Sequence, residues 1–215
     1  MWLWSIAAAS VGAFTVFWLF GAPSKSIEHP LKKGDGREKN EASIAFAASF
    51  NPPHKGHVAI LAQLARDYAS VVAIVAVNPN KNYAVSAETR KAILKQLVKE
   101  LHLPNVRVEI TTDYAWRFCT KHGIPWLARG IRTFAKDGFA EKILECQNLM
   151  APIMLGPFAL PVRTQYLLCG EHKELAQISS TQVRRRLVDA KPIDDLMPPA
   201  PEAVQMVHNA APWGG

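Results

Sequence analysis

Short apolar runs alternate with segments of helical periodicity along the chain from Ser43 onward. Continuous apolar runs rich in β-branched residues are typical of strands that are buried on both faces of a parallel sheet. Such runs predict strands over residues 44–48, 70–77, 106–110, 126–128 and 164–169. Helices are predicted between and after them, over residues 60–68, 86–101, 113–122, 137–150, 178–187 and 203–208. This alternation predicts an α/β, Rossmann-like fold: an open, mostly parallel five-stranded sheet with helices on both faces.

Two of these helices allow more detailed predictions. Ser86 is predicted to cap the helix that it opens, with Glu88 in the first turn. The predicted inward face of the helix over 137–150 consists of Phe139, Ile143, Leu144 and Gln147. The apolar, proline-punctuated segment 151–162 that follows has no predicted element, and we consider it a candidate for an oligomer interface.

The first residues differ from the rest of the chain. Trp2 to Gly21 are uncharged and apolar over about the length that a membrane-spanning helix needs. Basic residues begin only at Lys25, so the positive-inside rule predicts a membrane anchor with the C-terminal body facing the cytoplasm. The alternatives are an extension outside the working protein, or a targeting or signal segment whose removal leaves a cytoplasmic or organellar protein. The predicted segments are a hydrophobic segment over 1–21, a polar linker over 22–41 and one globular domain over 42–215.

Charge and cysteine content narrow the classes of partner. The formal net charge is +7, and residues 1–40 hold five basic and three acidic residues, so +5 remains on the body. A moderately basic body suits an anionic substrate. Apart from Arg184–Arg186 there is no basic run, so no nucleic-acid partner is expected. The three cysteines are widely spaced, which indicates neither a disulfide framework nor a zinc site and fits a reducing compartment.

The loop Ser49–His57, with the sequence SFNPPHKGH, lies between the first predicted strand and the first helix. At such a turn the free amides and the dipole of the helix favour phosphate, and α/β folds bind their ligands there. Gly56 allows the backbone to approach a ligand closely. His57 can donate to a phosphate oxygen and adds positive charge if it is protonated. An isolated H-x-G-H, here beginning at His54, is equally compatible with a proline-broken loop that carries surface histidines.

Three further loops that follow predicted strands carry groups that suit an anion. Lys81 follows the second strand, and Arg129 and Arg132 follow the fourth, where guanidinium forks match phosphate geometry. Ser179–Thr181 opens a helix and presents hydroxyl and amide donors. Each group alone is also consistent with a surface residue or an ordinary helix cap. Because parallel strands bring these loops to one edge of the sheet, together they indicate chemistry at phosphorus by positioning and charge neutralisation.

Four motifs carry a resemblance to a known family: SFNPPHKGH, NPNK followed by SAETR, RGIR followed by a D-x-x-x-E stretch, and ISSTQVR. In order and spacing, from about Ser43 to His208, they resemble the nucleotidyltransferases of the T/H-x-G-H superfamily, most closely the phosphopantetheine adenylyltransferases. The resemblance implies adenylyl transfer from ATP to 4′-phosphopantetheine, giving dephospho-coenzyme A and pyrophosphate in coenzyme A biosynthesis. It also implies Mg²⁺ as a cofactor, and we expect a homo-oligomer.

The resemblance implies roles for the residues at matching positions. His57, Lys81 and Arg129 would be catalytic: His57 would bind the α-phosphate of ATP, and Lys81 and Arg129, together with Ser49, would bind phosphopantetheine. The implied ATP-binding residues are Ser49, Phe50, His54, Gly56, His57, Arg132, Glu141, Ser179, Ser180, Thr181 and Arg184. The chain holds one residue more than the family pattern between Arg132 and Glu141.

Two other functions stay open at this point. Asn51 and Thr181 give F-N-P-P-H and I-S-S-T-x-x-R, which are equally at home in the nicotinate and nicotinamide mononucleotide adenylyltransferases of NAD biosynthesis. The RGIR segment and Lys81 favour the phosphopantetheine branch over that one. The second alternative is an inactive, membrane-tethered nucleotide-binding protein.

Overall fold

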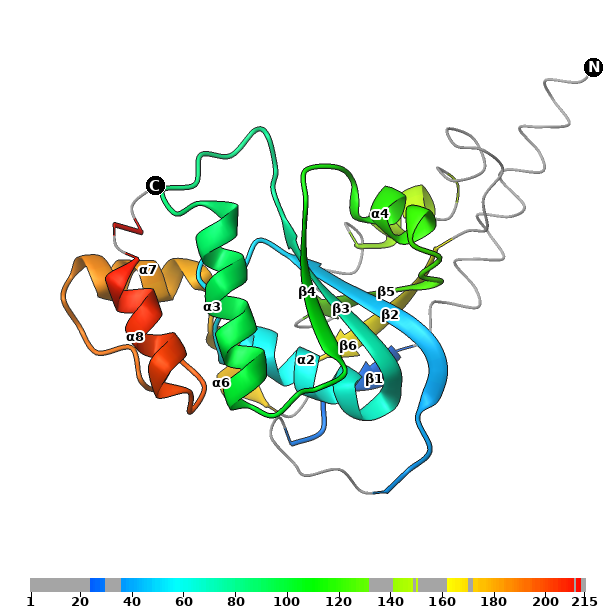
Figure 1. Ribbon diagram of the computed structural model, residues 1–215, viewed down its shortest axis with the longest axis horizontal. Coiled ribbons are helices and arrows are strands. Elements are labelled where there is room, and N and C mark those ends of the chain that lie inside the picture. The colour runs from blue at the N-terminus through cyan, green and yellow to red at the C-terminus, as the bar shows by residue number, and fades with distance from the viewer. Residues whose placement is uncertain are drawn as a thin grey trace, which may run out of the picture.

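The computed structural model describes residues 24–29, 36–131, 141–148, 150, 162–169, 172–210 and 212–213. They form a six-stranded sheet in the spatial order β1-β6-β5-β2-β3-β4, in which neighbouring strands are parallel (Figure 1). The strands are β1 (Ser24–Ser26), β2 (Asn40–Ala48), β3 (Tyr68–Ala76), β4 (Val106–Thr111), β5 (Trp126–Ile131) and β6 (Arg163–Leu168). The predicted parallel α/β fold is confirmed.

The prediction of five strands was wrong by one. The additional strand, β1, lies in the segment 22–41 that was predicted to be a linker, and it pairs with β6 so that Ser24 lies opposite Tyr166. Its three residues, Ser24, Lys25 and Ser26, are polar and exposed at the edge of the sheet. A short edge strand of this kind has no apolar run to reveal it, because it buries no side chains of its own.

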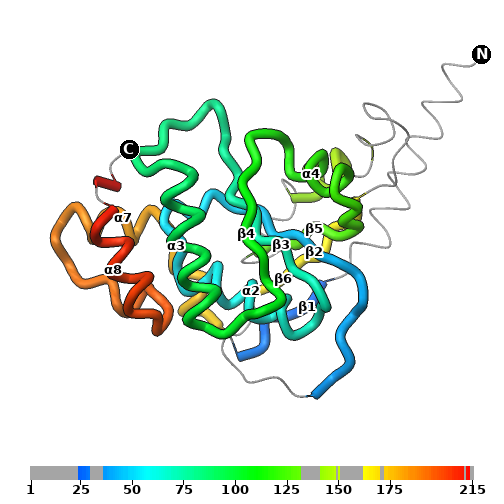
Figure 2. The backbone as a smooth tube through the Cα atoms, viewed as in Figure 1, coloured from blue at the N-terminus to red at the C-terminus, as the bar shows by residue number. Residues whose placement is uncertain are grey.

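The order of the strands marks one position at the edge of the sheet where a ligand is expected to bind. From β2 the chain builds outward through β3 and β4 on one side, and through β5 and β6 on the other. The connection therefore reverses direction between β2 and β5, which are hydrogen-bonded neighbours. Ligands in open α/β sheets bind outside the carboxyl ends of the strands at such a switch point. Figure 2 shows that the loops after β3 and β4 leave the sheet on the same side.

Helices cover both faces of the sheet. They are α2 (Lys55–Asp67), α3 (Ala87–Glu100), α4 (Ala115–Lys121), α6 (Lys173–Gln177), α7 (Ser180–Val188) and α8 (Pro201–Asn209), and residues 141–148 are also helical. Alternate residues of β3 belong to two separate cores: Val71, Ala73 and Val75 join the larger cluster, and Val72 and Ile74 the smaller one. This period of two is the alternation of side chains across a strand. It explains why β3 reads as a continuous apolar run.

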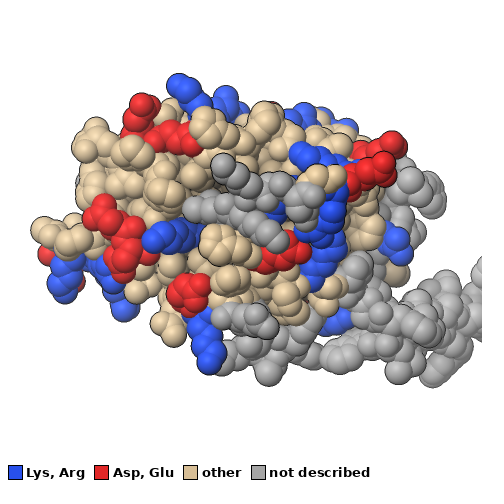
Figure 3. Space-filling model, turned by 90° about the horizontal axis from the view of Figure 1, so that it is seen from below, with Lys and Arg blue, Asp and Glu red and all other residues tan. Residues whose placement is uncertain are grey.

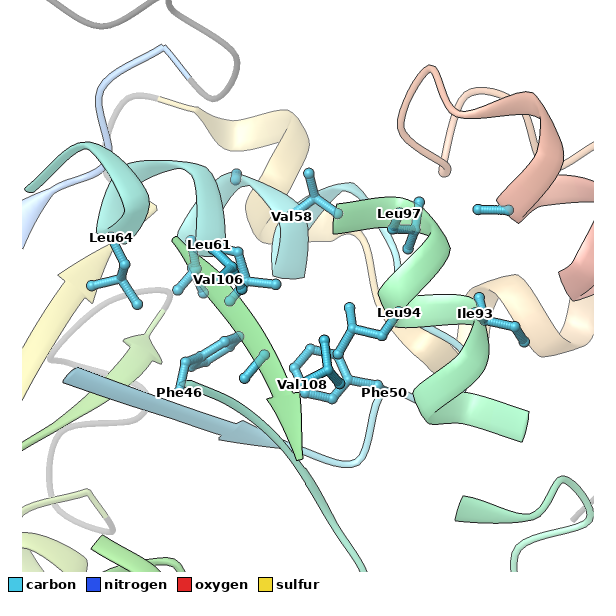
Figure 4. Packing of buried hydrophobic residues seen from close by; sticks show 14 of the residues in the cluster. Phe46, Phe50, Val58, Leu61, Leu64, Ile93, Leu94, Leu97, Val106 and Val108 are labelled. Carbon is cyan, nitrogen blue, oxygen red and sulfur yellow. The ribbon is translucent and has the colours of Figure 1, made fainter. Parts of the chain in front are cut away.

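The larger core packs α2, α3 and α8 against one face of the sheet. Figure 4 shows Leu61 of α2 and Leu94 of α3 between their helices and the sheet, close to Phe46 and Val108. Phe50, from the loop after β2, is fully buried in the same cluster. Ser86 caps α3 as predicted, because its side chain accepts a hydrogen bond from the backbone N–H of Thr89 at 3.1 Å. The smaller core includes α4 on the opposite face.

Two predictions about helices differ from the structure. In the helix over 141–148, Ile143 and Leu144 are 52% and 39% exposed, whereas Glu145 and Asn148 are buried, so the predicted inward face was wrong. The Tyr166 hydroxyl donates to Glu145 Oε2 at 2.9 Å, which satisfies a polar group that the apolar pattern would place outward. The five-residue helix α6 was not predicted, since it is too short for a periodic signal. Phe139 and residues 151–161 lie outside the described residues.

The predicted membrane-anchored localisation is contradicted. Across the part of the chain that the structure describes, no helix combines the length and the apolar character needed to cross a bilayer. Trp2 to Gly21, from which the anchor was predicted, lie outside the described residues.

Charged side chains of both signs are mixed over the surface. On the face shown in Figure 3, basic and acidic residues are interspersed among uncharged ones. Exposed pairs join them in places, such as Lys25 Nζ with Asp67 Oδ2 at 3.3 Å and Arg37 Nη2 with Glu28 Oε2 at 3.1 Å. Such pairs contribute only about 0–1 kcal/mol each to stability. Among the described residues on this face, the positive charge is not gathered into one patch.

Candidate functional site

The loop after β2 ends at His54, which caps helix α2. The His54 Nδ1 atom accepts a hydrogen bond from the backbone N–H of Gly56 at 3.1 Å. A Cβ atom at Gly56 would lie 3.0 Å from Cε1 of His54 and 3.2 Å from its Nδ1. Only glycine therefore fits between the capping ring and the helix without a shift. In this structure the glycine of the H-x-G-H motif makes room for the cap.

His57 lies in the first turn of α2, with its ring centroid 3.9 Å from that of His54 and 4.9 Å from that of Phe50. Its Nδ1 atom is buried and has no hydrogen-bond partner among the described residues. Burial, together with the neighbouring His54, lowers the pKa of His57 well below its ordinary value. His57 is therefore neutral at pH 7 in the ligand-free protein and adds no positive charge there. A buried polar atom without a protein partner calls for a specific explanation, such as an ordered water or a functional role.

Burial lowers the pKa of His54 from its ordinary 6.5 to about 4, which predicts acid-sensitive stability. In the unfolded chain this side chain takes up a proton as the pH falls through 6.5, whereas in the folded protein it does so only near pH 4. The stability present above pH 6.5 is therefore lost between pH 6.5 and 4, by on the order of 3 kcal/mol. Urea unfolding at a series of pH values measures this loss.

The matched control for that prediction is His54→Asn. Asparagine keeps a capping acceptor at the N-terminus of α2 but does not titrate. The free energy of unfolding of the variant should fall less steeply over the same pH range. An equal slope in both proteins would show that His54 is not the titrating group.

Side chains from other helices hold the loop between β2 and α2 by its carbonyl groups. Arg90 of α3 donates through Nη1 to the Ser49 carbonyl at 2.5 Å. Arg184 of α7 donates through Nη1 to the Asn51 carbonyl at 2.6 Å, and the Ser180 hydroxyl donates to the Pro52 carbonyl at 2.9 Å. Phe50, between two of these anchored residues, has a φ of +46°, which is uncommon for a residue with a side chain. The loop is thus fixed in shape before any ligand arrives.

Arg129 and Glu141 form a two-point ion pair beside His57. Arg129 Nε donates to Glu141 Oε2 and Arg129 Nη2 to Glu141 Oε1, both at 2.7 Å. The hydrogen bonds that Arg129 donates to the Glu141 carboxylate raise the pKa of Arg129 above its ordinary value. A Cβ atom at Gly130, the next residue, would lie 2.3 Å from Cδ1 of Ile60. Glycine therefore lets the end of β5 pass close to α2, which brings Arg129 to the site.

The N-terminus of α7 borders the same site as His57 and Arg129. The Ser179 side chain caps the helix by accepting from the backbone N–H of Gln182 at 3.2 Å. Thr181 Oγ1 accepts from Arg184 Nη2 at 3.2 Å. The side-chain oxygens of residues 179–181 therefore all have protein partners in this structure. The helix N-terminus itself still favours an anion, through its backbone amides and its dipole.

These elements enclose a cavity of about 570 Å³. Its lining residues come from β2, α2, β5, the helix over 141–148, α6 and α7: Phe46, Ala47, Ala48, His54, Gly56, His57, Ile60, Arg129, Gly130, Ile131, Glu141, Cys169, Leu175, Ala176, Gln177, Ile178, Ser179 and Ser180. The volume and the mixed lining are those of a small-molecule site.

The structure brings together part of the predicted site. The predicted residues that line the cavity are His54, Gly56, His57, Arg129, Glu141, Ser179 and Ser180. The predicted residues outside the lining are Ser49, Phe50, Lys81, Thr181 and Arg184. Lys81 is exposed in a turn that its backbone N–H closes on the Asn78 carbonyl at 3.0 Å, and Arg132 lies outside the described residues. The fold therefore assembles the H-x-G-H, RGIR and ISST motifs around one cavity.

Two parts of the site were not predicted from the sequence. The backbone around Leu175 in α6 lines the cavity, and α6 has no periodic signal. Arg90 contacts the Ser49 carbonyl in the loop between β2 and α2, although no role was assigned to it. Its spacing offered a signal, because it precedes Ile93, Leu94 and Leu97 on the apolar stripe of α3, where a charged residue would be buried.

A parallel sheet with a cavity beside its switch point is typical of a nucleotide-binding class of α/β protein. Residues 45–186 match the family described as Cytidylyltransferase-like, and the chain belongs to this family.

Individual relatives are similar over most of their own length. The chain is 29% identical over 141 residues to the phosphopantetheine adenylyltransferase of Aquifex aeolicus, covering 66% of this chain and 80% of that protein. It is 29% identical over 155 residues to the phosphopantetheine adenylyltransferase of Heliobacterium modesticaldum, covering 72% and 85%. Among solved structures, the crystal structure of a "Putative Nicotinate-nucleotide Adenylyltransferase" from Vibrio parahaemolyticus aligns with a TM-score of 0.53 and 18% identity, covering 79% and 93%. This last similarity shows the fold alone.

Proposed function

We propose that this chain transfers the adenylyl group of ATP to 4′-phosphopantetheine, giving dephospho-coenzyme A and pyrophosphate. The observation that carries the proposal is one cavity lined by His57, whose Nδ1 is buried and unpartnered among the described residues, by Arg129 and by the N-terminus of α7. These groups suit a polyphosphate and an anionic acceptor. The relatives named phosphopantetheine adenylyltransferase support this acceptor.

The proposed chemistry is an in-line displacement. An oxygen of the acceptor phosphate forms a bond to the α-phosphorus, while the bond from that phosphorus to the oxygen bridging to the β-phosphate breaks and pyrophosphate leaves. Neutral His57 donates a hydrogen bond to the α-phosphate as charge builds up on it. Arg129 and Lys81 bind the acceptor phosphate and hold it in line. No enzyme side chain forms a bond to phosphorus.

Most of the other predicted ATP-binding residues have proposed roles around the phosphates or in shaping the loop, and Ser180 has both. Gly56, His54 and the Ser179–Thr181 turn are proposed to present the two helix N-termini to the ATP phosphates, and Glu141 is proposed to orient Arg129. Ser180 and Arg184 already donate to the loop backbone, and Phe50 is fully buried, so we propose that they shape the loop next to the phosphate site.

The side chains of the site do not form a metal centre. Within the described ranges, no group of three or more His, Cys, Asp or Glu side chains could hold a metal ion. The carboxylate in the cavity, Glu141, is engaged by Arg129. Mg²⁺ is therefore proposed to arrive with ATP, held by triphosphate oxygens with few protein ligands. No step is assigned to it.

Self-association is proposed from one surface feature. Ile143 and Leu144 are exposed on the helix over 141–148, next to the cavity. Large apolar side chains on a helix that already buries its polar face suit contact with a second copy of the chain. Sedimentation of the purified protein would show a homo-oligomer, and a monomer at micromolar concentration would contradict it.

The alternative acceptor is nicotinate or nicotinamide mononucleotide, because the F-N-P-P-H sequence around Asn51 fits that branch as well. Pyrophosphate release by the full chain with ATP should be measured in parallel with phosphopantetheine and with each mononucleotide. Release is expected with phosphopantetheine and not with the mononucleotides. Release with a mononucleotide alone would overturn the proposed acceptor, and release with neither would overturn the proposed activity.

A further inference from the structure

Arg90, in the first turn of α3, is a buried cation that the proposed mechanism does not use. It is 1% exposed, whereas arginine is almost never fully buried unless it is paired. Among the described residues no carboxylate pairs with it. Its contacts are instead two carbonyl groups and the face of an aromatic ring.

These contacts join two loops that follow different strands. Nη1 of Arg90 donates to the Ser49 carbonyl at 2.5 Å, in the loop after β2. The guanidinium carbon lies 4.2 Å from the ring centroid of Tyr83, in the loop after β3. Nε donates to the Ser86 carbonyl at 3.3 Å, which ties the same side chain to the start of its own helix. One rigid, planar group therefore sets the distance between the two loops.

Each of these loops carries or supports a group of the proposed reaction. Ser49 precedes Phe50, whose ring lies 4.9 Å from that of His57, so the first loop supports the side chain proposed to bind the α-phosphate. On the second loop, the Tyr83 hydroxyl accepts from the backbone N–H of Asn78 at 3.4 Å, and the Asn78 carbonyl closes the turn at Lys81. Arg90 thus connects the support of His57 with the turn that holds Lys81.

Stability alone does not account for a cation at this position. Burying a charge without a counter-charge is unfavourable, and a well-packed apolar residue on the Ile93 and Leu94 stripe would serve the core at least as well. Hydrogen bonds from a charged donor are strong in a buried environment, so the two carbonyl contacts hold their loops firmly. A buried cation at Arg90 is explained if its role is to keep the loops of Ser49 and Tyr83 at a fixed separation.

We propose that Arg90 is a positioning residue that fixes the distance between the ATP phosphates and the acceptor phosphate by bridging the loops of Ser49 and Tyr83. The inference rests on the proposed function, because it assigns the two loops to the two substrates. Arg90 touches neither substrate and acts through His57 and Lys81.

Replacing Arg90 with methionine is expected to lower turnover about 100-fold, because a small misplacement of reacting groups has an effect of this size. The dissociation constant of ATP should change by less than about tenfold, since the groups proposed to bind it remain. Arg90→Lys keeps the charge but cannot serve both carbonyl groups, so an intermediate turnover is expected. Lys95→Met removes an exposed cation of the same helix and should leave turnover and ATP affinity unchanged.

A double-mutant cycle with Lys81→Ala separates positioning from general stabilisation. If Arg90 acts through the turn of Lys81, the loss of kcat/KM in the double variant should be close to that of the slower single variant. If Arg90 only stabilises the fold, the two losses should multiply, and the proposal is overturned. Tyr83→Leu keeps the bond to Ser49 and should raise the KM of the acceptor while the affinity for ATP stays unchanged.

The other variants keep the proposal testable if the Arg90→Met protein is unstable. If that protein does not fold, Arg90→Lys and Tyr83→Leu are decisive, and unchanged kinetics in both would overturn the proposal. Failure of the proposed function has a different signature, because the unmodified protein would then release no pyrophosphate from ATP with phosphopantetheine. If the unmodified protein does release pyrophosphate and both variants keep its kinetics, only the positioning role of Arg90 is overturned.

Discussion

Replacing His57 with alanine should lower turnover by about 100- to 1000-fold, the effect of removing one hydrogen-bond donor to the charge of a transition state. His57 is half-buried and lines the cavity, and its buried Nδ1 has no partner among the described residues. ATP binding should persist, since the N-termini of α2 and α7 remain. Steady-state pyrophosphate release and calorimetric ATP binding measure the two quantities separately.

His208→Ala is the matched control for this prediction. His208 is an exposed histidine on α8, a helix that contributes no residue to the lining of the cavity. Thermal unfolding of both variants would report any loss of the ring contacts that His57 makes with His54 and Phe50. A folded His57→Ala protein with full turnover would remove His57 from the mechanism.

Replacing Arg129 with alanine should lower kcat/KM for the acceptor about 100-fold or more. The pair that this substitution removes is the proposed one between Arg129 and the acceptor phosphate. Truncating one partner of a buried, hydrogen-bonded charge pair between two molecules typically costs about 2–5 kcal/mol, and about 1.4 kcal/mol corresponds to tenfold. Arg129 is held by two 2.7 Å hydrogen bonds to Glu141, so the guanidinium is oriented before the acceptor binds. The dependence of the initial rate on acceptor concentration measures this effect.

Arg163→Ala is the control for Arg129. Arg163 begins β6 and lies over the ring of Trp126 at 5.3 Å, at the opposite end of the strands from the cavity. Its removal should leave the kinetics unchanged. Equal effects of the two substitutions would indicate a general dependence on positive charge instead of a site at Arg129.

The sequence predicted the fold wherever burial leaves a pattern. β3 reads as a continuous apolar run because both of its faces are buried, and the structure confirms it. The exposed strand β1 and the five-residue helix α6 have no such pattern and were missed. The helix over 141–148 reversed its predicted face, because the buried Glu145 bonds to the Tyr166 hydroxyl and Leu144 faces outward. Contacts between distant residues decide such cases, and periodicity does not encode them.

The same limit applies to the site. The motif loops could be predicted to meet, because loops that follow parallel strands share one edge of the sheet. Which partner each side chain takes could not be predicted: Arg184 and Ser180 donate to the carbonyl groups of the loop after β2. The neutral state of His57 depends on its burial against His54, which its position in the chain does not show. Lys81 is at the predicted edge but outside the lining of the cavity.

The central claim, adenylyl transfer to phosphopantetheine, is tested most directly in the reverse direction. The full chain is incubated with pyrophosphate and either dephospho-coenzyme A or nicotinate adenine dinucleotide, and ATP formation is followed over time. The account predicts that ATP forms from dephospho-coenzyme A, and that the His57→Ala variant forms it about 100- to 1000-fold more slowly. ATP formation from the dinucleotide and none from dephospho-coenzyme A would contradict it.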